Sequence, residues 1–149
     1  MRNYANRTRA CLTILTILVA STICLGNPVL PNPVLIFTGA EYLEVNGART
    51  VRYYFDVFNK DAYPADMFAA SPTLPPCGNN TKAARTWVDI YDQSGKRLQG
   101  FCALGKPGDL GKIWFSLSID AVPPSWIYIE LNDRQTNTKY KSNLAETVM

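Results

Sequence analysis

The chain has 149 residues, enough for one ordinary domain, with a formal net charge of +3 and no histidine. Without histidine there is no Ser-His or Cys-His nucleophile system, and the commonest general base and zinc ligand are missing. Composition therefore argues against the familiar histidine-dependent enzymes and leaves carboxylates, lysines and hydroxyls as candidate chemistry.

The first 26 residues have the composition of a signal peptide. Three arginines within the first nine residues precede an uncharged, mostly apolar run over 10–25, which is shorter than the roughly 20 residues of a bilayer span. We predict a removable signal peptide over 1–26, an exported domain over 27–149, and no stable membrane anchor after cleavage. A lipoprotein modified at Cys24 and an uncleaved anchor are the alternatives. Each of these readings places the domain outside the cytoplasm, so the predicted location is secreted or periplasmic.

Removing that segment leaves a neutral domain. The basic count of 15 falls by the three arginines to 12, which equals the 12 acidic residues, all of which lie beyond residue 26. A neutral domain without a basic stripe is a poor match for phosphate backbones or anionic membranes. We therefore expect no nucleic-acid partner.

Cysteine usage agrees with export. Cys77 and Cys102 are the only cysteines beyond the predicted signal peptide, and two cysteines in an oxidising compartment usually pair. The predicted disulfide would contribute about 3 kcal/mol by chain-entropy arithmetic. Two free buried thiols are the alternative, and the spacing excludes a Cys-x-x-Cys redox motif.

Beyond residue 33 the chain is a series of short β-branched and aromatic runs separated by Gly, Asn, Asp and Pro, without an amphipathic helix. This pattern is typical of an all-β sandwich. We predict seven antiparallel strands, at 34–45, 50–58, 86–92, 97–104, 113–119, 126–132 and 138–143.

The first two runs are joined by Asn-Gly at 46–47, the strongest short signal for a type I′ hairpin turn. A two-residue loop there sets Glu44 opposite Arg49. Further along the same pair of strands, Glu41 faces Arg52. Opposite charges across the strands support this register.

The third and fourth runs are joined across Gln93-Ser94-Gly95. A three-residue loop with Gly95 in the left-handed region keeps apolar or small residues together on one face. The predicted pairs on that face are Ile90 with Leu98, Val88 with Gly100 and Thr86 with Cys102. The predicted pairs on the other face are Trp87 with Phe101, Asp89 with Gln99 and Tyr91 with Arg97.

The strand order, with a Tyr-rich run at 126–131 and Tyr-Lys-Ser-Asn at 140–143, resembles a fibronectin type III or immunoglobulin-like sandwich. The antibody Cys-Trp-Cys arrangement is missing. Segments 76–80, 85–92 and 100–105 are also similar to small exported bacterial proteins of unassigned function. That similarity supports export and the disulfide and implies no activity, and the sandwich fold hosts many functions.

In a fibronectin-like order the third, fourth, sixth and seventh strands share a sheet. Its outer face is predicted to carry five aromatic residues, interleaved with charged residues: Trp87, Tyr91, Phe101, Tyr128 and Tyr140. Exposed aromatic patches among polar neighbours usually bind a partner, here another protein or a glycan. The alternative is that the Pro-rich, aperiodic stretch over 59–76 folds over these rings as a second small core.

These observations favour an exported, non-catalytic binding or adaptor module that uses the aromatic face, the 59–76 loop or both. A structural subunit of a cell-envelope or secreted assembly is the first alternative, and a hydrolase acting through carboxylates alone is the second. We expect no cofactor and no metal site, because Asp92-x-Ser94-Gly95 lacks the remaining oxygen ligands of a calcium loop.

Overall fold

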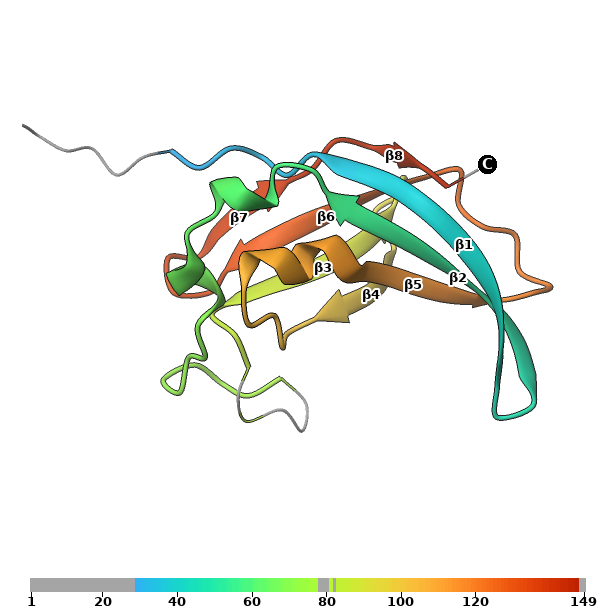
Figure 1. The fold of residues 1–149 in the computed structure, drawn as a ribbon, viewed down its shortest axis with the longest axis horizontal. Coiled ribbons are helices and arrows are strands. Elements are labelled where there is room, and N and C mark those ends of the chain that lie inside the picture. The colour runs from blue at the N-terminus through green and yellow to red at the C-terminus, as the bar shows by residue number, and fades with distance from the viewer. Residues whose placement is uncertain (1–28, 78–80, 82, 148–149) are drawn as a thin grey trace, which may run out of the picture.

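The computed structural model describes residues 29–77, 81 and 83–147, and the predicted signal peptide lies outside them. The described chain is mostly β-strand, arranged as two antiparallel sheets packed face to face (Figure 1). None of its helices is both long enough and apolar enough to cross a membrane. The all-β sandwich predicted from the strand pattern is confirmed.

The first sheet has the order β1-β2-β5, formed by β1 (Leu35–Val45), β2 (Ala48–Val57) and β5 (Ile113–Ser118). The β1–β2 turn has positive φ at both central residues, 52° at Asn46 and 77° at Gly47, as a type I′ turn requires. The predicted register, with Glu44 opposite Arg49 and Glu41 opposite Arg52, is confirmed.

The second sheet has the order β4-β3-β6-β7, and β8 also pairs with β6. Its strands are β3 (Thr86–Asp92), β4 (Arg97–Phe101), β6 (Trp126–Asp133), β7 (Thr138–Lys141) and β8 (Ala145–Glu146). The predicted grouping of the third, fourth, sixth and seventh strands is confirmed, but the described residues form eight strands and not seven.

The last predicted strand, 138–143, ends at Lys141, and the eighth strand follows beyond its predicted range. The Ser142 hydroxyl accepts a hydrogen bond from the Ile129 N–H at 2.9 Å. The Asn143 amide accepts from the Leu35 N–H at 2.8 Å and donates to the Leu35 carbonyl at 3.1 Å. The two Asn143 contacts tie the segment between β7 and β8 to the start of β1. This segment therefore does not continue the regular β6–β7 ladder.

The β3–β4 hairpin confirms part of its predicted register. Gly95 has a φ of +86° in a three-residue loop, and Tyr91 faces Arg97 as expected. A β-bulge then shifts the pairing by one residue, so Phe101 faces Val88 and the predicted Trp87–Phe101 pair is wrong. The other predicted pairs beyond the bulge are wrong for the same reason. The bulge sends Phe101 toward the core, as an apolar ring requires.

The core fills the space between the sheets, and the 59–76 stretch closes one end of it. Two short 3₁₀ turns, η1 (Lys60–Ala62) and η2 (Ala65–Phe68), shape this stretch. Its Tyr63, Met67 and Phe68 are buried in the same cluster as the strand residues. A third turn, η3 (Pro107–Lys112), adds buried Leu110. The long Pro-rich stretch is therefore part of the packed core.

Candidate functional site

The structure gathers three of the five predicted aromatic residues on the outer face of the second sheet. Trp87 and Tyr91 alternate along β3 with fully buried Val88 and Ile90. Tyr128 lies opposite Tyr91 on β6, and the two rings stack with their centroids 5.3 Å apart. The period of two in these strands therefore predicted the face correctly.

The other two predicted residues, Phe101 and Tyr140, lie on the inner side of the sheet. The bulge in β4 places Phe101 opposite buried Val88, and its ring meets Trp114 edge-on at 5.7 Å. Tyr140 lies opposite Leu131 and packs against the core. It alternates with two lysines on β7, and burying the aromatic ring while the ammonium groups stay solvated is the cheaper arrangement.

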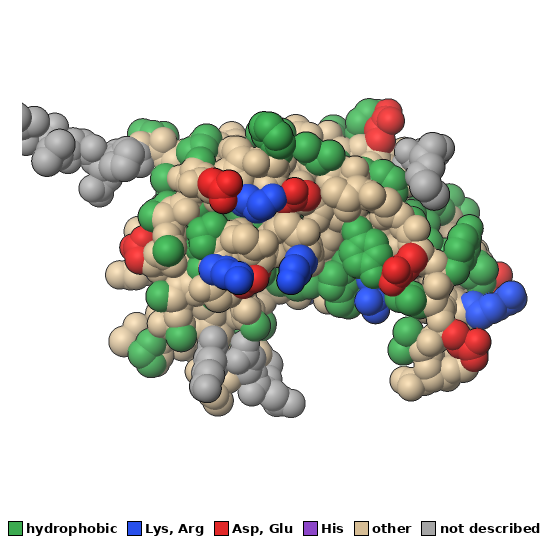
Figure 2. All heavy atoms as spheres, viewed as in Figure 1, with side chains coloured by type: hydrophobic (Ala, Val, Ile, Leu, Met, Phe, Trp, Pro, Cys, Tyr) green, Lys and Arg blue, Asp and Glu red, His purple; other side chains and the backbone are tan. Residues whose placement is uncertain are grey.

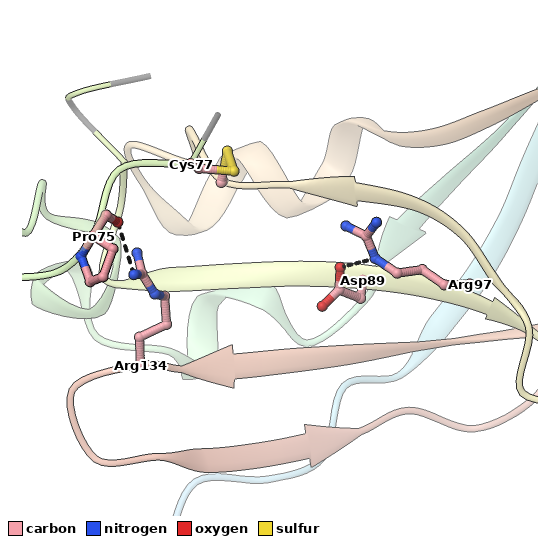
Figure 3. Close-up of a disulfide and its surroundings, with 6 residues drawn as sticks. Pro75, Cys77, Asp89, Arg97 and Arg134 are labelled. Carbon is pink, nitrogen blue, oxygen red and sulfur yellow. Dashed lines mark hydrogen bonds and ion pairs between the residues drawn. A yellow bond between two sulfur atoms is a disulfide. The ribbon is translucent and has the colours of Figure 1, made fainter. Parts of the chain in front are cut away.

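The Arg134 side chain covers one face of the Trp87 ring. The Arg134 guanidinium lies 3.8 Å from the centre of the indole ring, and its Nη2 donates to the Pro75 carbonyl at 2.9 Å. The indole Nε1 is buried and has no hydrogen-bond partner among the described residues. Figure 3 shows Arg134 reaching Pro75 in the loop beside the disulfide. The disulfide joins Cys77 to Cys102, as predicted. Arg134, from the turn after β6, therefore covers the indole ring of Trp87 and is itself bonded to the 59–76 loop.

The rest of the outer face is held together by paired charges. Asp89 and Glu130 lie directly opposite each other. Asp89 accepts from the Arg97 Nε at 2.7 Å (Figure 3), and Glu130 from the Lys139 Nζ at 3.3 Å. Two adjacent carboxylates are the minimum that a glycoside hydrolase needs, but cations already occupy oxygens of both. Among the described residues, no group of three or more His, Cys, Asp or Glu side chains could hold a metal ion.

A buried ion pair next to Trp87, where β3 begins and β6 ends, is structural. The Arg85 guanidinium bonds both carboxylate oxygens of Asp133, at 2.7 and 2.5 Å, and Asp133 is 3 % exposed. Burial opposes ionisation of Asp133, but bonds from Arg85, Thr136 and the Gln135 N–H outweigh it and lower the pKa of the carboxyl. The pair lines a hollow of about 630 Å³. Arg85 also contacts Asp66, the third charged residue of the lining, at 3.3 Å, so each charged side chain in the hollow has an oppositely charged partner.

The apolar surface that the sequence did not predict lies under the β1–β2 hairpin. A cleft of about 350 Å³ is lined mainly by apolar side chains from β1, β2 and the β5–β6 connection. A second hollow of about 230 Å³ shares Tyr42 and Ile119 with it. The lining residues of the first hollow are Ala40, Tyr42, Val51, Tyr53, Ile119, Ala121, Pro123 and Thr147. We refer to the two hollows together as the hairpin cleft.

The hairpin cleft exists because the first two strands are longer than the sheet that opposes them. β1 and β2 have 11 and 10 residues, whereas the longest strand of the opposing sheet, β6, has eight, and Figure 1 shows the hairpin curving out beyond the second sheet. Along the core-facing side, Phe55 is fully buried, Tyr53 is 9 % exposed and Tyr42 is 78 % exposed. The inner face of the sheet thus continues past the point where the second layer ends.

Two carboxylates of the β1–β2 hairpin, Glu44 on the cleft side and Glu41 on the other face, lack a cationic partner in the described chain. Each of them nevertheless faces an arginine. Arg52 instead lies 4.2 Å from the Trp114 ring centre, and Glu41 accepts from the Tyr54 hydroxyl at 2.5 Å. Figure 2 shows acidic and basic side chains next to each other over the hairpin end of the molecule.

No family model matches this chain. Searches of the curated proteins and of the solved structures find no match either. The function must therefore be argued from the geometry of the two surfaces.

Proposed function

We propose that this protein is an exported, non-catalytic binding module whose binding site is the hairpin cleft. The observation that carries the proposal is the exposure of Tyr42, 78 % of which is open to solvent although it lies on the core-facing side of its sheet. Apolar surface left open in this way usually has a partner. The partner class we favour is another protein.

The scaffold supports this role. A three-stranded sheet facing one built from the third, fourth, sixth, seventh and eighth strands resembles a fibronectin type III or immunoglobulin-like domain. Such sandwiches present edges and loops to partners while the core stays fixed. The disulfide between Cys77 and Cys102 supports residence in an oxidising compartment, secreted or periplasmic.

The proposal moves the binding site away from the face predicted from the sequence. Phe101 and Tyr140 pack against the core, and Trp87 is covered by Arg134. Tyr91 and Tyr128 stack on each other, and the Lys141 Nζ lies 3.9 Å from the centre of the Tyr128 ring. The ring faces of this surface are thus largely occupied within the domain, whereas Tyr42 is free.

Site-specific photo-crosslinking tests the proposal. A photoreactive phenylalanine analogue is placed at position 42, and in separate variants at positions 58 and 128, in the exported protein in its native cells. Phe58 is a matched control, because it is 72 % exposed but does not line the hairpin cleft. We expect one adduct that forms from position 42 and not from position 58.

Adducts that form only from position 128 would contradict the cleft and restore the aromatic face as the binding surface. An adduct from position 42 to a second copy of this chain would instead support the structural-subunit alternative. Mass spectrometry of the adduct distinguishes these outcomes.

A further inference from the structure

We propose that the partner recognised at the hairpin cleft is an extended peptide segment that adds as a strand to the free edge of β1, beside the cleft, and carries alternating apolar and basic side chains. This inference rests on the proposed binding function and specifies the chemistry of the partner. Its evidence is the direction of the backbone groups of β1, the side chains on each face of its edge, and the unpaired carboxylates.

The free edge lies in the outer half of β1. β1 is the terminal strand of its sheet, with β2 on one side only. Near its start the edge is already closed, because Asn143 bonds both backbone groups of Leu35. A bulge between Phe37 and Gly39 then reverses which residues point toward β2. The outer half therefore differs from the closed beginning of the strand.

The turn geometry identifies the backbone groups that are open to a partner. In a two-residue hairpin the residues that flank the loop, here Val45 and Ala48, form a hydrogen-bonded pair. Alternation along β1 then turns the N–H and C=O of Ala40, Tyr42 and Glu44 away from β2. These are the groups that an added strand pairs with.

The same three residues present their side chains to the hairpin cleft. An incoming strand would therefore place the residues opposite Ala40 and Tyr42 beside these two side chains, on the side away from β2 and at the mouth of the hairpin cleft. These two positions of the partner should be apolar, since a polar group there would lose its water without gaining a bond.

The carboxylates of β1 predict which partner residues should be basic. Glu44 lies on the cleft side and Glu41 on the other face, and both lack an ion pair within the described chain. Basic residues opposite these two carboxylates complement the edge. A second copy of β1 is a poorer occupant, because it would bring two further carboxylates to the same edge.

An antiparallel partner is then read as basic, any residue, apolar, basic, apolar, in that order. A synthetic test peptide with acetyl and amide ends and the core Lys-Thr-Val-Lys-Val flanked by threonines has this pattern. Its control replaces both lysines with glutamate. Binding is measured by fluorescence anisotropy at low ionic strength, and hydrogen exchange locates the peptide on the domain.

We expect the lysine peptide to bind at least about tenfold more tightly than the glutamate peptide and to protect the amides of Ala40, Tyr42 and Glu44. The double variant Glu41→Lys with Glu44→Lys should reverse the preference. Asp61→Lys, an exposed acidic residue on η1, is the control for net charge. Tyr42→Ala should weaken binding, and Phe58→Ala should not. Circular dichroism confirms that each variant is folded.

Equal binding of both peptides, or protection confined to other strands, overturns the inference. If position 42 crosslinks a partner in cells but neither peptide binds, the strand-addition inference fails and the proposed binding function stands. If the crosslinked molecule is a glycan or a lipid, the inference also fails. If position 42 crosslinks nothing and neither peptide binds, both the inference and the proposed function fail.

Discussion

Arg134 determines how much of Trp87 meets solvent. Its guanidinium lies on the indole ring and is held there by the Pro75 carbonyl. A cation on an aromatic face gains about 1 kcal/mol when it is partly desolvated. The position of Arg134 has a larger effect than this attraction. Arg134 contacts both the Trp87 ring and the 59–76 loop, so it joins the loop to the outer face of the second sheet.

Because Trp87 is half-buried, Trp87→Ala should lower the free energy of unfolding by up to about 3 kcal/mol, the lower end of the loss on truncating a fully buried aromatic. Tyr91→Ala should cost clearly less, because no loop residue covers that ring among its described contacts. Urea denaturation of the two variants measures the difference. Equal and small losses of unfolding free energy in the two variants would show that Arg134 does not cover Trp87 in solution.

Gly95 is needed for its backbone conformation. Its φ of +86° lies in the region that β-branched residues avoid, so Gly95→Val should cost about 1 kcal/mol or more. Gly108→Val is the control, since φ there is not positive and no atom lies within 4 Å of an added Cβ. A tolerated Gly95→Val in thermal unfolding would contradict the three-residue loop.

Asp133 should make the domain sensitive to acid. Its pKa is lowered in the folded state, so its contribution is fully present above the unfolded pKa of about 3.9 and is lost as the pH falls through the folded value. Stability should therefore drop below about pH 4. Asp133→Asn should reduce that slope, while Asp61→Asn should not. Urea midpoints between pH 6 and pH 2 provide the comparison.

At the scale of elements, the 59–76 stretch behaves as a packed segment. It has no strand or helix period, yet Tyr63, Met67 and Phe68 are buried. Burial raises the pKa of the Tyr63 hydroxyl, which donates to the Pro31 carbonyl at 2.7 Å. The stretch is held at its far end by the disulfide, so cross-linking and core packing act on the same segment.

Replacing both cysteines should test that link. The double variant Cys77→Ser with Cys102→Ser opens a loop with a sequence separation of 25, and it should lower the free energy of unfolding by about 3 kcal/mol. Combining it with Trp87→Ala should give less than the sum of the two losses, because both changes release the loop from the outer face. Additive losses would show that the disulfide and Trp87 stabilise the domain independently.

At the scale of the whole molecule, export connects the sequence to the disulfide. We predict that the exported protein begins between residues 23 and 33 and contains no free thiol. Intact-mass and alkylation measurements on protein recovered from the culture fluid or the periplasm check both statements. Retention of Met1, or two alkylatable cysteines before reduction, would contradict the predicted export.

The sequence by itself determined the features that depend on neighbouring residues. Alternation along the strands identified the inner and outer sides of β3 and β6, and the Asn-Gly pair identified the first hairpin with its register. The predicted export and the two cysteines beyond residue 26 predicted the disulfide correctly. These features are local because side-chain period and turn conformation are properties of a few consecutive residues.

Tertiary structure alone decided which faces were finally covered. Three features arise from competition for the space between the sheets. They are the bulge that turns Phe101 toward the core, the end of β7 at Lys141 and the packing of the 59–76 stretch. The hairpin cleft has the same origin. Tyr42 has the alternation of a core residue, and it is exposed because the opposing sheet ends before reaching it. Burial depends on what lies across from a residue, which its neighbours in sequence do not specify.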